Sequence, residues 1–152
     1  MPRHREKAYA EIRSFVHATE DPAKVEEAVK NLIPINPEEM RLKRTVMHGH
    51  HGNRILRIEA KLSGDDVFIV IDSLFKQLHS LDEEALRREF HKYIDAQGTV
   101  YLRFCKQQAL KRRVVLRESD SISFRIRLGV HPKSFYELKQ YLEEKTCSRN
   151  EG

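Results

Sequence analysis

Residues 121–130 contain the feature that most constrains the fold of this chain. Apolar residues occupy every second position from Ile122 onward, and Ser123, Arg125 and Arg127 stand between them. Successive side chains of a β-strand point to opposite faces of its sheet, so this alternation predicts a strand with one buried face and one cationic face. A strand of that kind indicates a sheet that buries one of its two faces.

Similar alternation recurs elsewhere in the chain and is interspersed with helical periodicity. It predicts further strands and a final hairpin, at residues 8–18, 40–48, 55–62, 99–104 and at 114–116 with 122–130. The helical spacing of apolar residues predicts helices at residues 22–32, from 63 or 65 to 78, 80–94, 106–111 and 133–144. Asp21 and Pro22 supply the N-cap and first position of the first helix.

This mixture of periods predicts an α+β protein. We expect a single two-layer domain, mainly an antiparallel sheet with helices packed on one face. The domain should span residues 8–145, because the chain of 152 residues shows no linker or repeat that would divide it. Residues 1–7 are expected to form a flexible basic N-terminal arm, and residues 146–152 a disordered polar tail.

Positive charge is concentrated in residues 101–131. This stretch holds eight Lys and Arg residues against two acidic ones, a local excess of six in a chain whose formal net charge is +5. Concentrated positive charge on a folded element favours a polyanionic partner, usually a nucleic acid. A solvated basic surface without a ligand is the alternative.

Strands 8–18, 99–104 and 121–130 would join their polar faces if they lie in one sheet. Arginine and aromatic side chains together suit RNA, because guanidinium groups bind phosphates and flat rings stack on unpaired bases. The same face could instead serve a protein-interaction module or a homodimer. The candidate RNA-binding residues are Arg13, Phe15, Tyr101, Arg103, Lys106, Lys111, Arg112, Arg113, Arg125 and Arg127.

The sequence contains no P-loop, dinucleotide fingerprint or nucleophile elbow, and no signature of converging carboxylates for a metal-dependent nuclease. We therefore expect a non-catalytic protein without a cofactor, and an RNA hydrolase is the weaker alternative. His48, His50 and His51 could supply part of a zinc site, but no cysteine or carboxylate lies nearby at ligand spacing. Metal binding at this turn is therefore open but not favoured.

The composition also bears on location. No stretch approaches the roughly 18 apolar residues of a membrane span, and the charged first residues do not form a secretory signal. Two cysteines, Cys105 and Cys147, are too few for a disulfide scaffold. We expect a cytoplasmic protein without a membrane partner.

Three stretches resemble an archaeal family of RNA-binding proteins and predicted exosome subunits. They are the string Tyr101-Leu-Arg-Phe-Cys-Lys-Gln-Gln-Ala109, the opening Ala10–Asp21, and the Gly52-Asn53 turn before strand 54–62. Members of that family commonly carry an aspartate at the position of Cys105, so this sequence departs from the pattern there. Arg103, Lys106 and Gln107 are the matching polar residues.

The resemblance implies a two-layer α+β fold, of the kind shared with the large-subunit ribosomal protein that carries 5S RNA. It also implies RNA binding without a known enzymatic activity. The expected role is that of an accessory factor in RNA processing or exosome-linked decay, with RNA and possible exosome or other RNA-processing proteins as partners.

Overall fold

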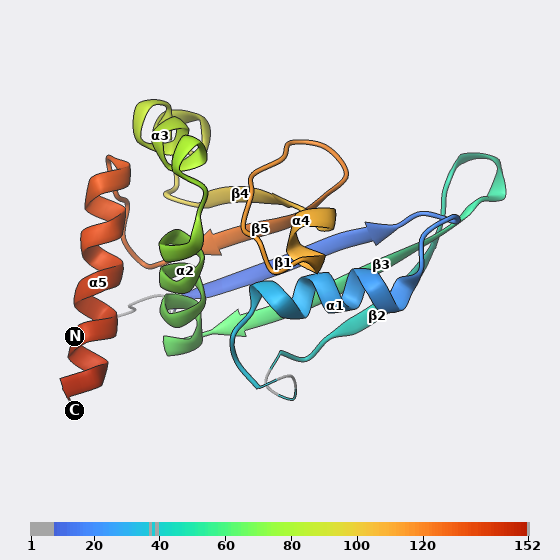
Figure 1. Cartoon of the computed structure of the whole chain (residues 1–152), viewed down its shortest axis with the longest axis horizontal. Helices are drawn as coiled ribbons and strands as arrows, with labels where there is room; N and C mark the ends of the chain where they lie inside the picture. Colours follow the sequence, from blue (N-terminus) through green and yellow to red (C-terminus); the bar gives the residue numbers. More distant parts are fainter. Residues whose placement is uncertain (1–7, 37, 39, 152) are drawn as a thin grey trace.

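A five-stranded sheet organises the structure, a computed structural model that describes residues 8–36, 38 and 40–151. All strand pairs are antiparallel, in the order β2-β3-β1-β5-β4 (Figure 1). The strands are β1 Tyr9–Val16, β2 Lys43–His48, β3 Arg54–Ser63, β4 Val100–Cys105 and β5 Ser121–Arg127. β1 is therefore the central strand, and β2 and β4 form the two edges of the sheet.

Helices cover one face of this sheet (Figure 1). The α-helices are α1 Pro22–Leu32, α2 Asp65–Gln77, α3 Ser80–Arg88, α4 Lys106–Leu110 and α5 Phe135–Glu151. Two short 3-10 helices, η2 and η3, span His50–Gly52 and Phe90–Lys92. α1 begins as predicted, because the Asp21 carboxylate accepts the N–H of Ala23 at 3.0 Å and Pro22 follows as the first helical residue.

The core lies between the helices and the inner face of the sheet. Ile12, Phe104 and Phe124 are each at most 1% exposed, and the two phenylalanine rings meet edge to face with centroids 5.3 Å apart. In each of β1, β4 and β5 the buried apolar residues alternate with more exposed ones. The structure confirms an α+β fold with helices on one face, and the alternate side chains form a second, open face.

The predicted hairpin between residues 114–116 and 122–130 is wrong. β5 pairs with β1 on one side and with β4 on the other, so neither of its edges is free for residues 114–116. Leu116 instead bridges Phe104 on the outer edge of β4, and Val114 bridges Leu78. The alternation does mark a strand at β5, but the partner of that strand depends on strand order.

The ends of several elements also differ from prediction. β1 stops at Val16 and leaves Ala18 exposed. The helix predicted at 80–94 is divided into α3 and η3. α5 continues to Glu151, beyond the end of the helix predicted at 133–144, and the predicted arm at residues 1–7 lies outside the described residues. No helix within the described ranges is long and apolar enough to cross a membrane.

Candidate nucleic-acid interface

The open face of the sheet is formed by the outward side chains of all five strands. β1, β4 and β5 do share one sheet, and the register places the candidate residues of these strands on one face: Arg13, Phe15, Tyr101, Arg103, Arg125 and Arg127. Arg127 lies opposite Tyr9, and Arg125 lies between Glu11 on β1 and Tyr101 on β4. Directly opposite side chains in such pairs are about 5 Å apart at Cβ, so they form a continuous surface.

Basic side chains predominate on this open face. In the described strands it carries two acidic residues, Glu11 and Glu59, and seven basic residues: Arg13, Lys43, Arg57, Lys61, Arg103, Arg125 and Arg127. Lys43, Arg57 and Lys61 are absent from the predicted set. The alternation in residues 55–62 already placed Arg57 and Lys61 on a polar face, but the pairing of β3 with β1 was needed to join that face to the others.

Glu59 is a buried acid at the centre of the β3 side of the open face, with 7% of its surface exposed. Its carboxylate accepts a hydrogen bond from Arg13 Nε at 2.7 Å, and Arg57 Nε lies 4.0 Å away. Burial by itself would raise the pKa of Glu59, but the hydrogen bond and charge of Arg13, with the charges of Arg57 and Lys61, lower it below its ordinary value. Glu59 therefore stays ionised and holds Arg13 in place.

An unsatisfied pair of polar groups lies beside Glu59. Thr45 on β2 is directly opposite Arg57 on β3. Thr45 Oγ1 and Arg57 Nε are both buried and have no hydrogen-bond partner among the described residues. Buried donors without partners are costly, and because both atoms are buried, a ligand on the open face does not reach them in this conformation.

The arginines on β4 and β5 are held by hydrogen bonds and, at Arg125, also by an ion pair. Arg127 Nε donates to Thr99 Oγ1 at 3.0 Å, and Arg103 donates to the carbonyl of Glu118 at 3.1 Å. Arg125 reaches Glu11 at 3.4 Å, and its pKa is raised by its hydrogen bond with Tyr101 and by the neighbouring Tyr9 and Glu11. These contacts orient the guanidinium groups, whose planar forks of N–H donors suit phosphate oxygens.

Two aromatic side chains are prominent on the open face. Phe15 is 42% exposed and Tyr101 is 40% exposed. They lie two strands apart, and Phe15 is opposite Arg57 whereas Tyr101 is opposite Arg125. The structure therefore places both predicted stacking residues on the same face, at separate positions along it.

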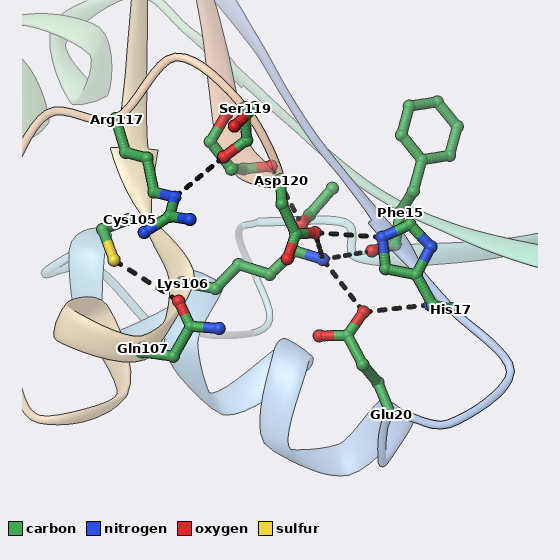
Figure 2. Close-up of polar contacts among 11 residues, drawn as sticks. Phe15, His17, Glu20, Cys105, Lys106, Gln107, Arg117, Ser119 and Asp120 are labelled. Atoms are coloured by element: carbon green, nitrogen blue, oxygen red, sulfur yellow. Dashed lines mark hydrogen bonds and ion pairs between the residues drawn. The ribbon is translucent and has the colours of Figure 1, made fainter.

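Lys106 is not on this surface, contrary to prediction. It is the first residue of α4 and is 4% exposed. Its ammonium group donates to the carbonyl of Phe15 at 2.5 Å, to Glu20 at 3.1 Å and to Asp120 at 2.9 Å (Figure 2). It joins the end of β1 to α4 and to the loop before β5, and no RNA phosphate can reach it in this conformation.

The same cluster contains three potential metal ligands, His17, Glu20 and Asp120. Lys106 is already hydrogen-bonded to the two carboxylates, and His17 Nε2 lies 3.0 Å from Asp120, so their charges are compensated internally (Figure 2). Among the described side chains, which exclude that of His50, this is the one group with metal-ligand geometry. The turn at His48 and His51 is not part of it.

The basic triplet Lys111-Arg112-Arg113 is exposed but belongs to the helical layer. It follows α4, which packs against α1 through a hydrogen bond from the Asn31 amide to the carbonyl of Ala109 at 3.0 Å. The structure thus separates the predicted residues into an open-face group, the buried Lys106 and this triplet on the other layer.

Comparison with known proteins gives a consistent result. A family described as RNA binding matches residues 9–128. RNA-binding protein PAB1135 from Pyrococcus abyssi is 34% identical over 125 residues, which cover 80% of this chain and 81% of that protein. The crystal structure of protein AF2318 from Archaeoglobus fulgidus superposes with a TM-score of 0.71 and 25% identity, over 92% of this chain and 99% of that one. The chain therefore belongs to the RNA-binding family.

Proposed function

We propose that this protein binds single-stranded RNA without catalysis, through the open face of its sheet. The observation that carries the proposal is the charge of the face that the helices leave uncovered: it holds seven basic side chains and two acidic ones. Guanidinium groups would hold phosphates, and Phe15 and Tyr101 would stack on bases. The family membership and the name of the Pyrococcus relative support RNA as the partner.

The contacts divide into two regions by their position. Arg103, Arg125 and Arg127 supply oriented cations at the β4–β5 side, and Lys43, Arg57 and Lys61 supply cations at the β2–β3 side. Phosphate contacts of this kind position an RNA strand without reading its sequence. We therefore propose sequence-tolerant binding, consistent with an accessory role in cytoplasmic RNA processing or exosome-linked decay.

Salt dependence tests this proposal. Fluorescence polarisation of a labelled mixed-sequence RNA would be measured at three salt concentrations. If about four phosphates are neutralised, log affinity should fall against log salt with a slope of about −3 for a single strand. A slope near zero would contradict phosphate binding. Intact RNA after incubation with magnesium or manganese is expected, and cleavage would favour the hydrolase alternative.

A second function is favoured by apolar exposure at one end of the open face. Phe15 is 42% exposed and Met47 is 38% exposed. Exposed apolar groups next to an edge strand suit a protein partner or a homodimer. Light scattering after size exclusion tests this alternative: a stable dimer that Phe15→Glu converts to monomer would favour it, and a monomer at all concentrations would exclude self-association.

A further inference from the structure

The outer edge of β4 has a gap between two flanking segments. At one end the N–H of Tyr101 donates to the carbonyl of Tyr93 at 2.8 Å. At the other end the N–H of Arg117 donates to the carbonyl of Arg103 at 2.9 Å. Because alternate residues of a strand direct their backbone groups to the same edge, the carbonyl of Tyr101 and the N–H of Arg103 face outward between these segments.

A pocket of about 310 Å³ lies at this gap and adjoins the open face. This volume is near the lower limit of small-molecule sites, so the pocket suits a compact ligand. Two tyrosines, three cations, one carboxylate and one leucine line it: Tyr93, Tyr101, Lys92, Arg103, Arg117, Glu118 and Leu116. Proteins that bind single-stranded nucleic acids combine aromatic rings, on which the bases stack, with cations that hold the phosphates.

The two guanidinium groups of the pocket, those of Arg103 and Arg117, are hydrogen-bonded to backbone carbonyls. Arg103 donates to the carbonyl of Glu118 at 3.1 Å, and Arg117 donates to the carbonyl of Ser119 at 3.1 Å (Figure 2 shows the second bond). In the part of the chain that the structure describes, no carboxylate is ion-paired with either group. Lys92, by contrast, is paired with Glu89. Arg103 and Arg117 are therefore the groups best placed to hold an anion.

We propose that this pocket receives one unpaired nucleotide of the bound RNA. Its base would contact Tyr93 and Tyr101, and its phosphate would be held by Arg103 and Arg117. The proposal rests on the proposed function and adds Tyr93 and Arg117, which are absent from the predicted set. A peptide strand is a poorer occupant, because strand addition needs a run of free edge groups and the gap offers one carbonyl and one N–H.

The test compares an RNA with a ribose-phosphate chain of the same length that lacks bases. Stacking of one base on an aromatic side chain contributes about 1–3 kcal/mol. Wild type should therefore bind the RNA roughly tenfold or more tightly than the abasic chain. Tyr93→Ala should remove most of this preference. Tyr136→Ala, which truncates an exposed tyrosine on α5, should leave the preference unchanged.

Arg117→Gln provides a second variant. Arg117 is exposed, whereas Tyr93 is half-buried, so this change does not disturb packing. It should weaken RNA binding and reduce the magnitude of the salt slope by about 0.7, because one phosphate contact is lost. If wild type binds RNA and the abasic chain equally and with the same sensitivity to salt, the nucleotide pocket is refuted. The proposal that the protein binds phosphates would remain. Failure of wild type to bind either chain would overturn both proposals and point to a protein partner.

Discussion

Replacing Lys106 with methionine should destabilise the fold without weakening RNA binding. The Lys106 side chain is 5% exposed, whereas its partners Glu20 and Asp120 are 24% and 39% exposed. Removing one partner of a fully buried pair costs about 3–5 kcal/mol, and an exposed pair contributes about 0–1 kcal/mol. Because both carboxylates can regain water, we expect a loss of about 2 kcal/mol. This corresponds to a fall in Tm of about 4–8 °C for a domain of this size.

Urea unfolding and calorimetry at neutral pH would measure this loss. Lys111→Met is the matched control, because Lys111 is an exposed lysine and its loss should change stability by less than about 0.5 kcal/mol. If Lys106→Met is as stable as wild type and RNA affinity falls, then Lys106 contacts RNA and the argument from its burial is refuted.

The pH dependence gives an independent check on the same cluster. The hydrogen bond from Lys106, assisted by His17, lowers the pKa of Asp120 below its ordinary value of 3.8. A carboxyl whose pKa is lowered in the folded state stabilises the fold above its ordinary pKa, and this contribution is lost as the pH falls through the folded pKa. The stability difference between wild type and Lys106→Met should therefore narrow as the pH falls below 3.8.

Three further variants test the open face and the packing beneath it. Glu59→Gln should bind RNA more tightly at low salt, since it removes a negative charge and releases Arg13 from a 2.7 Å ion pair; weaker binding would show that Glu59 is needed to position Arg13. Asp21→Ala removes the N-cap of α1 and should cost about 1 kcal/mol in urea unfolding. Phe124→Ala should cost about 3–5 kcal/mol in the same assay, because Phe124 is 1% exposed and packs on Phe104.

Local patterns in the sequence were sufficient to predict most of the fold. The alternation around Arg125 and that around Tyr101 each depend on the geometry of a single strand. The structure places both residues on the predicted face. The cap at Asp21 also depends on neighbours in sequence and was predicted correctly. The partner of residues 114–116 was not, because strand order is a property of the whole chain and β5 has β4 and β1 as its neighbours.

The candidate site was less predictable for the same reason. Lys106 occurs in a basic stretch, but its counterions, Glu20 and Asp120, lie 86 and 14 residues away in sequence. Tyr93 and Arg117 are brought to Tyr101 and Arg103 by bridges on the edge of β4, which no local pattern reveals. Charge composition thus indicated the type of ligand, while the residues that face it depend on tertiary contacts.

The central claim is that RNA binds the open face of the sheet, and a pair of charge-matched variants tests it most directly. Arg125→Glu/Arg127→Glu changes the open face, whereas Lys24→Glu/Lys30→Glu makes the same change in net charge on α1, in the other layer. RNA affinity would be measured by fluorescence polarisation at one low salt concentration, after circular dichroism shows that both variants fold. The account predicts a large loss of affinity for the first variant and a small one for the second. Equal losses in the two variants, or a larger loss for the α1 variant, would contradict it.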